Sequence, residues 1–365
     1  MARDHDADGG GMMIREASPD DGPMLVDFFR DTPIAAGTTF AFDRGPDFFA
    51  LLRAQGEHRT LLMHDGGRLV GTATVLWHRA HDGDRVVRLG EVRDLRLGRG
   101  HRGGRSAWRL LAAVHDVLRE IVVDSVVSLI SDANRDAIPM ASGRLGLLRL
   151  APTTRYLSAH YLGWLAPQAR RSPWRVTPAK DGDGEALMGL FKSGRRALRF
   201  DPVEGPMWPD PSGRSSAWLA RDRRDRPVGA LLLWDGEAVR RIRVTHYDWR
   251  EWPLRLLSHA AGLLRVTVPL PPPGGVLRTW ASRGFAVESH DPRLVRALLG
   301  AALRAAARSG RHVVQLNLRE SDPVIPLLPS WPRSLHHSTV YAGPLHADPR
   351  SPSPIGDVHA DIALA

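Results

Sequence analysis

Residues 91–108 constrain the fold of this chain more than any other segment. An alternating strand pattern containing two acids, Glu91 and Asp94, leads into a loop dense in arginine and glycine, and an amphipathic helix follows at once. A strand, a glycine-rich turn and a helix start in this order gather backbone N–H groups at the helix N-terminus, which suits a phosphate or pyrophosphate. The segment therefore predicts a phosphate-binding turn with carboxylates just upstream of it.

The same segment carries a longer motif. Leu95-Arg96-Leu97 is followed, after four residues, by Arg102-Gly103-Gly104-Arg105-Ser106-Ala107. This order resembles the acyl-CoA loop of the GNAT superfamily of N-acyltransferases, which runs hydrophobic-x-hydrophobic, four residues, then Arg-Gly-x-Gly-x-Gly/Ala. Arg105 stands where the family usually has its middle glycine, and Gly104 lies one residue earlier. The resemblance implies an α+β fold, a mixed and mostly antiparallel sheet flanked by helices, and an acyl-CoA cosubstrate.

The resemblance also implies catalytic roles for the two acids. Glu91 is the implied general base, and Asp94 is a second candidate that regular alternation places on the opposite side of the strand. In that arrangement only one of them faces the acceptor. The alternatives are that Glu91 pairs with Arg88 or Arg93, and that Asp94 makes a structural hydrogen bond or ion pair.

Several further residues are implied ligands of the cosubstrate. The main chain from Leu95 to Leu97 would bond the pantetheine arm, and the backbone N–H groups of the loop would hold the pyrophosphate. The arginines of the loop would add charge, although a solvated surface is an equal alternative for them. The implied cofactor-binding set is Leu95, Leu97, Arg99, Arg102, Gly103, Gly104, Arg105, Ser106, Ala107 and Asn134.

The general acid is missing from its usual place. Asn134-Arg135-Asp136-Ala137 matches an Asn-x-x-Ala element of the family, but Ala141 stands where a tyrosine is common. Tyr156 and Tyr161 belong to later strands and are more typical of packed aromatics. Because a thiolate with a pKa near 8.5 leaves readily, the missing tyrosine does not exclude transfer.

Internal repetition indicates two copies of one fold. Val126-Val-Ser-Leu129, running to Ile138-Pro139, recurs 187 residues later as Val313-Val-Gln-Leu316, running to Ile325-Pro326. Each copy follows an amphipathic helix. The sequence therefore predicts tandem GNAT-like domains. Their expected bounds are a disordered leader at 1–13, a catalytic domain at 14–166, a linker at 167–173, a C-terminal domain at 174–344 and a disordered tail at 345–365.

The second copy lacks the chemistry of the first. Phe285-Ala-Val287 corresponds to Leu95-Arg-Leu97, but no glycine follows, and Pro292 falls where Arg102 would be. Proline has no N–H to offer a phosphate. Ala281 takes the place of Glu91. The C-terminal domain is therefore expected to be a degenerate lobe that shapes the acceptor side or braces the first lobe.

Composition narrows the class of protein. The chain has 365 residues and no cysteine, which excludes disulfides and a thiol nucleophile. The net charge is +10, but the arginines are scattered, so a solvated surface is favoured over a nucleic-acid site. No apolar run could span a bilayer, and residues 1–13 lack a signal-peptide core, so we expect a cytoplasmic protein without a membrane partner. His78 and His81, like His336 and His337, lack companion ligands and predict no metal site.

The expected function is an acyl-CoA-dependent N-acyltransferase that moves acetyl or a longer acyl group to a small-molecule or peptide amine. Two alternatives stay open. One is a noncatalytic binding or scaffold protein with this fold. The other is a transferase whose donor is borne by an acyl carrier protein or a tRNA.

Overall fold

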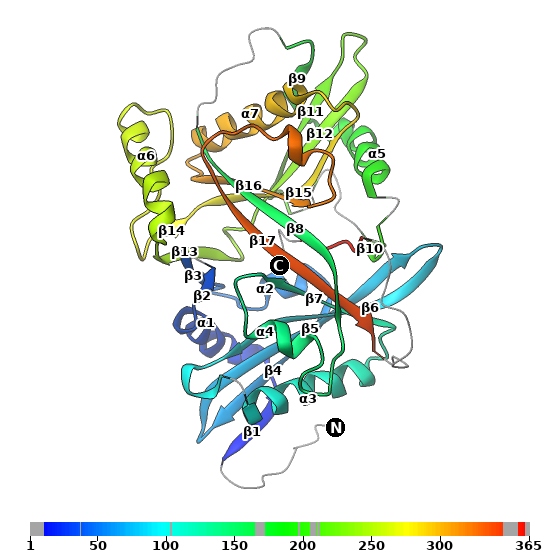
Figure 1. Cartoon of the computed structure of the whole chain (residues 1–365), viewed down its shortest axis with the longest axis vertical. Coiled ribbons are helices and arrows are strands. Elements are labelled where there is room, and N and C mark those ends of the chain that lie inside the picture. The colour runs from blue at the N-terminus through cyan, green and yellow to red at the C-terminus, as the bar shows by residue number, and fades with distance from the viewer. Residues whose placement is uncertain are drawn as a thin grey trace.

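The computed structural model describes residues 11–36, 38–102, 104–164, 172–195, 198–204, 210, 212–345 and 357–361 (Figure 1). The first half of the chain begins with a strand and a helix, and its two longest strands, β5 and β6, lead to the predicted phosphate loop. Its elements are β1 (Met12–Glu16), α1 (Gly22–Asp31), β2 (Ile34–Ala36), β3 (Thr38–Asp43), α2 (Ala50–Arg53), β4 (Glu57–Asp65), β5 (Arg68–Asp82), β6 (Arg85–Leu97), α3 (Gly104–Glu120), β7 (Ser125–Ser131), α4 (Ala137–Ala141) and β8 (Ala151–Leu162).

The second half also begins with a strand and a helix and ends on a long strand. Its elements are β9 (Arg175–Pro178), α5 (Gly184–Arg195), β10 (Asp201–Pro202), β11 (Ser215–Arg221), β12 (Pro227–Asp235), β13 (Arg241–His246), α6 (Trp252–Leu263), β14 (Val276–Leu277), β15 (Thr279–Val287), α7 (Pro292–Arg308), β16 (Val313–Arg319) and β17 (Arg333–Pro344).

One large sheet runs through both halves. Within the described residues its thirteen strands follow the order β1-β4-β5-β6-β7-β17-β8-β16-β15-β12-β11-β9, and β10 pairs with β5. A smaller sheet, β14-β13-β3-β2, joins strands from both halves. Most pairs are antiparallel, while β6 with β7 and β15 with β16 are parallel. The predicted α+β fold class with a mixed, mostly antiparallel sheet is confirmed.

The last strand of each half pairs with the other half. Strand β8 pairs with β16, with Leu162 opposite Val313, and β17 pairs with β7, with Pro344 opposite Ser125. Strands β8 and β17 also pair with each other and cross the centre of the molecule (Figure 1). The expected bounds at 14–166 and 174–344 therefore divide the chain but not the sheet. Most of the expected linker, residues 167–171, lies outside the described residues.

This exchange predicts that the first half does not fold alone. In a fragment ending at residue 166, β8 loses both of its partners and β7 loses β17, so two strand edges with buried side chains become exposed. We expect no cooperative thermal unfolding of this fragment by circular dichroism, and recovery when residues 167–365 are coexpressed with it. A fragment that unfolds cooperatively by itself would contradict the exchange.

The strand pairing also sets the register of the repeat. Strands β7 and β16 are equivalent and begin at residues 125 and 313, an offset of 188. Val126 packs with residues of α3, and Val314 packs with residues of α7. The offset of 187 found in the sequence is thus one residue short. Strands buried on both faces are apolar throughout, so two such strands align almost as well when one is shifted by a residue. The parallel pairs place Ala281 opposite Gln315 and Glu91 opposite Val127, so Ala281 does correspond to Glu91.

Two ends of the chain are more ordered than the sequence indicated. Met12 and Met13, expected in the leader, belong to β1 and pair with β4. Residues 357–361, expected in a disordered tail, pack against the sheet: Val358 is fully buried, and its carbonyl accepts a hydrogen bond of 2.9 Å from the hydroxyl of Tyr156. These two parts of the prediction are wrong. In the tail, the surrounding polar and proline-rich residues gave no sign that a single apolar side chain, Val358, is buried against the sheet.

Two buried histidines face each other where β8 meets β17. The ring centroids of His160 and His336 lie 4.8 Å apart, and Nε2 of His336 lies 3.5 Å from Oε1 of Glu251. Burial, with His336 close by, holds the pKa of His160 well below its ordinary value. Burial also lowers the pKa of His336, although Glu251 opposes this.

These shifts predict acid sensitivity. The unfolded chain takes up protons at these histidines as the pH falls through about 6.5, and the folded chain does not, so stability is lost in that window by about 1.4 kcal/mol per pH unit for each such histidine. Urea unfolding at two pH values on either side of 6.5 would measure the loss. We expect His160→Gln to reduce the slope and the exposed His290→Gln to leave it unchanged. A slope that is the same in both variants would contradict this.

Candidate active site

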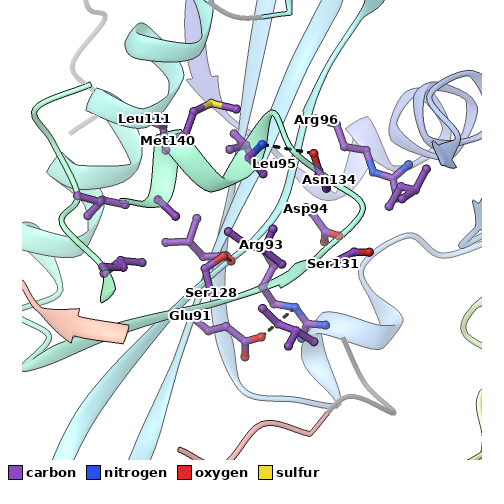
Figure 2. A pocket seen from close by; sticks show the side chains of 18 of the residues that line it. Glu91, Arg93, Asp94, Leu95, Arg96, Leu111, Ser128, Ser131, Asn134 and Met140 are labelled. Atoms are coloured by element: carbon purple, nitrogen blue, oxygen red, sulfur yellow. Dashed lines mark hydrogen bonds and ion pairs between the residues drawn. The ribbon is translucent and has the colours of Figure 1, made fainter. Parts of the chain in front are cut away.

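Strands β6 and β7 separate along their length and leave a cavity between them (Figure 2). They pair only over Leu89–Glu91 and Ser125–Val127. Just past this pairing, the hydroxyl of Ser128 donates a hydrogen bond of 3.0 Å to the carbonyl of Val92. Beyond it lies a cavity of about 230 Å³. The opening is a wedge whose narrow end lies next to Glu91.

A β-bulge accompanies this separation. Thr72 pairs with Arg96 and Thr74 with Arg93, so β6 carries an extra residue between them. Asp94 has φ +52°, in the left-handed region that aspartate tolerates better than most residues. A bulge increases the local twist of its strand. In this chain the bulge lies at the point where β6 separates from β7.

The bulge changes which side chains share a face. Arg93 hydrogen-bonds Gln55 and Asp94 pairs with Arg44, both on the side of α1 and α2. Leu95 packs on the other side, with the apolar residues under α3. The prediction that Asp94 points away from Glu91 is therefore wrong, because it assumed regular alternation through a strand that is bulged.

The cavity has two unlike walls. One wall is apolar and is formed mainly by residues of β6, α3, α4 and β7. The other wall is charged, and it combines residues of β6 with Arg44 from the first half of the chain and Arg240 from the second half. The apolar wall includes Leu95, Leu111, Ile130, Met140, Leu148 and Leu150, and the charged wall includes Arg44, Glu91, Arg93, Asp94, Arg96 and Arg240.

Asp94 is held by a buried arginine. Its carboxylate accepts two hydrogen bonds from Arg44, of 2.7 and 2.8 Å, and the two side chains are 10% and 4% exposed. Burial alone would raise the pKa of Asp94, but the guanidinium groups of Arg44, Arg93 and Arg96 outweigh it and hold that pKa below its ordinary value. The structural ion pair, one of the two expectations for Asp94, describes this geometry.

Glu91 lies where two cavities meet. Its side chain is 21% exposed and Oε1 lies 3.4 Å from Nε of Arg93, which is one of the two pairings expected for it (Figure 2). A second cavity, of about 480 Å³, shares Glu91 and Arg93 with the first and extends past Trp77 and His78. Burial lowers the pKa of His78, so its imidazole is neutral near pH 7.

The predicted phosphate loop opens α3. A 3₁₀ turn, Arg99–His101, precedes it, and Gly104 starts the helix with φ +58°, a conformation that favours glycine. Arg99, Arg102 and Arg105 are exposed, while Ser106 and Ala107 are buried. Gly103 lies outside the described residues. The wall of the first cavity includes Leu111 of α3 but none of these described loop residues, so the loop lies apart from that cavity.

The Asn134 element shapes the turn after β7. The backbone N–H of Asn134 donates to the carbonyl of Ser131 at 2.8 Å, and its side-chain oxygen accepts from the N–H of Ala137 at 3.3 Å (Figure 2). Ala141, in the position of the missing tyrosine, lines the cavity. The hydroxyl of Tyr156 bonds Val358, and that of Tyr161 donates to the carbonyl of Pro329 at 3.0 Å, so both tyrosines are packed in the sheet.

Sequence reasoning missed three residues of this site. Arg44 follows β3 and Arg240 lies between β12 and β13, far from the motif along the chain. Arg240 stacks over Phe42 at 5.5 Å, and burial lowers its pKa to about 9. His78 was considered only as a metal ligand. Nothing local in the sequence distinguishes the two arginines from the many others.

The corresponding place in the second half also holds a cavity, of about 280 Å³. Residues 359–361 line the cavity beside β15 and β16, and Nε of Arg283 lies 2.8 Å from the carboxylate of Asp361. The ring of Phe191 packs against Gly284. No group of three histidine or acidic side chains in the described part of the chain could hold a metal ion.

Comparison with known proteins identifies the fold. No protein-family model and no curated protein sequence matches the chain. Two structures of Saccharomyces cerevisiae N-myristoyltransferase with bound myristoyl-CoA do match, each with a TM-score of 0.57. One is 10% identical over 94% of this chain and 84% of that chain, and the other is 11% identical over 99% and 95%.

A probable N-acyltransferase from Enterococcus faecalis V583 matches with a TM-score of 0.51 and 9% identity, over 92% of this chain and 73% of that chain. Similarity at such low identity defines the fold alone. The chain has the tandem GNAT-like fold of these proteins, and the resemblance found in the sequence is confirmed at that level.

Proposed function

We propose that the chain is an acyl-CoA-dependent N-acyltransferase. The observation that carries the proposal is the wedge between β6 and β7, which opens beside Glu91 and meets a second cavity there. A donor in one cavity and an acceptor in the other would place carbonyl and amine on either side of one carboxylate. The similar N-myristoyltransferase structures hold myristoyl-CoA, which supports an acyl-CoA donor.

The donor would lie along β6. Its pantetheine arm would bond the strand edge from Leu95 to Leu97 as an added strand does, with the amide of Asn134 opposite. The apolar wall would take the alkyl parts of the arm and an acetyl or longer acyl group. The pyrophosphate would lie at the start of α3, where backbone N–H groups and the helix dipole favour anions, and Arg99, Arg102 and Arg105 are exposed to add charge.

Glu91 would act as the general base. Its carboxylate would take a proton from the acceptor ammonium, directly or through water, and the freed amine would attack the thioester carbonyl. The tetrahedral intermediate would then expel CoA as thiolate, and the nitrogen would pass its extra proton to that thiolate, which gives the amide and the free thiol. His78, neutral and close to Glu91 in the second cavity, would accept the proton in turn.

The acceptor would enter through the second cavity. Its walls mix aromatic and charged side chains and include Trp77 and the carboxylates of Glu57 and Glu91, which suits a small-molecule or peptide amine that arrives as an ammonium. Asp94, fixed by Arg44, would position the bulge and not exchange protons.

Calorimetric titration of the purified chain with acetyl-CoA, myristoyl-CoA and CoA tests the donor site. We expect binding of at least one acyl-CoA, and weaker binding in Arg102→Glu, which places an anion against the phosphates. Arg119→Glu is the matched control, since Arg119 is exposed at the other end of the same helix. No binding of any of the three ligands, or equal binding in both variants, would remove this proposal.

A further inference from the structure

Helix α6 turns its apolar side toward solvent. In the part of the chain that the structure describes, twelve large apolar side chains are exposed, and six of them lie on α6 and the residues flanking it. The side facing the protein carries the fully buried Ser258, whose hydroxyl bonds the N–H of Leu270. The exposed six are Trp249 (73%), Trp252 (43%), Leu256 (62%), Leu257 (47%), Leu263 (87%) and Leu264 (76%).

Trp252, Leu256 and Leu263 lie on one face of α6, because they follow the α-helical spacing of four and seven residues, and the exposed His259 lies between the two leucines. At 1.5 Å per residue this stripe is about 17 Å long. Trp249 belongs to the 3₁₀ turn Trp249–Glu251 that comes just before the helix. Helix α6 forms the outer edge of the second half, away from the large sheet (Figure 1). The stripe is therefore a convex apolar ridge.

The charges around the stripe are basic. Arg250 and Arg255 stack over Trp249 and Trp252, at 5.4 and 5.0 Å from the ring centroids, and Arg265 is exposed just past the helix.

The two acids of this segment, Asp248 and Glu251, both accept hydrogen bonds from the protein. Glu251 accepts a hydrogen bond of 2.7 Å from Thr38 in the protein interior, and Asp248 accepts one of 2.8 Å from the N–H of Arg250. Toward solvent the ridge thus presents tryptophan, leucine, arginine and the exposed His259.

We propose that α6 docks this protein on an anionic phospholipid surface and lies in the plane of the interface. Leucines on one face, arginine at the flanks and tryptophan at one end are the composition of an interfacial helix. A convex ridge without a facing groove suits a fluid headgroup layer, which needs no complementary shape, and the basic flanks match anionic lipid.

The proposal departs from the expectation of no membrane partner, which rested on the lack of a spanning segment. No helix in the described residues is long and apolar enough to cross a membrane, and a helix lying on the surface needs no such length. The inference does not depend on acyl transfer, and its test measures no turnover.

Sedimentation of the full chain with lipid vesicles is the test. We expect it to pellet with vesicles of three parts phosphatidylcholine to one part phosphatidylglycerol, to pellet less with pure phosphatidylcholine, and to be released by high salt. The double variant Leu256→Asp/Leu263→Asp should weaken binding by about tenfold or more for each leucine, because each loses its burial in the lipid. Val122→Asp, at an exposed apolar residue outside α6 (67%), should bind as the wild type does.

Quenching of tryptophan fluorescence by brominated phosphatidylglycerol gives a second readout with conservative variants. Trp249→Phe/Trp252→Phe should lose most of the quenching, and Trp108→Phe, which removes another exposed tryptophan (46%), should keep it. Failure of the wild type to bind anionic vesicles, or equal binding by the α6 variant, would overturn the proposal. A wild-type dimer that light scattering shows to dissociate in the double variant would assign the ridge to a second copy instead.

Discussion

Replacing Glu91 by glutamine is expected to lower kcat for acyl transfer by about a hundredfold to ten-thousandfold, the usual contribution of a general base. Glutamine keeps the size of the side chain and its place beside Arg93 but cannot take a proton. Binding of acyl-CoA should change little, because Glu91 stands at the junction of the two cavities and not at the phosphate loop. Release of free CoA thiol from acyl-CoA, in the presence of a panel of peptide and small amines, measures the effect.

Glu185→Gln is the matched control. Glu185 is exposed on α5 and lines neither of the two cavities, so its loss should leave kcat near that of the wild type. Full activity in Glu91→Gln would exclude Glu91 as the base. A wild-type protein that binds acyl-CoA yet releases no thiol with any amine would favour the noncatalytic binding protein.

Removing the charge of Asp94 is expected to give the largest loss of stability of any single change considered above. Asp94→Asn should lower the free energy of unfolding by about 3–5 kcal/mol, since it leaves a buried guanidinium without its counterion. Asparagine tolerates the left-handed backbone at this position, so backbone strain does not add to the effect. Urea unfolding followed by circular dichroism measures the loss.

The variant pair Arg44→Met/Asp94→Asn separates the ion pair from other causes. Removing both charges should restore part of the stability lost by either alone, since Arg93 and Arg96 still lose the carboxylate of Asp94, and should give a coupling free energy of a few kcal/mol. Asp225→Asn is a close control: Asp225 also has a left-handed φ, of +62°, and pairs with Arg175, but its side chain is 67% exposed. Exposed pairs contribute about 1 kcal/mol or less. Equal losses in Asp94→Asn and Asp225→Asn would contradict a buried pair.

Local patterns in the sequence predicted the elements of the site but not its assembly. The alternation up to Leu97, the glycines at 103 and 104 and the apolar face of α3 are all local, and they predicted the strand, the turn and the helix. The bulge at Asp94 could not be predicted, because one extra residue in a strand leaves no mark in the pattern. Its consequence, two neighbouring side chains on one face, follows only from pairing with β5.

Long-range pairing accounts for what else was missed. The exchange of β8 and β17 depends on contacts between residues more than a hundred and fifty positions apart. The apolar pattern of a strand does not indicate which distant strand it pairs with. Arg240 reaches the first half's cavity for the same reason. In the tail, Val358 is a single buried residue among polar neighbours, and it contributes no periodicity that a sequence could reveal.

The most direct test of the account is an experimental structure of this chain with bound acyl-CoA, obtained with a thioether analogue that cannot transfer its acyl group. The account predicts continuous ligand density that starts at the N-terminus of α3, follows β6 past Leu95 and ends with the acyl carbon beside Glu91. Density that leaves the wedge between β6 and β7 empty while the ligand occupies another site would contradict it.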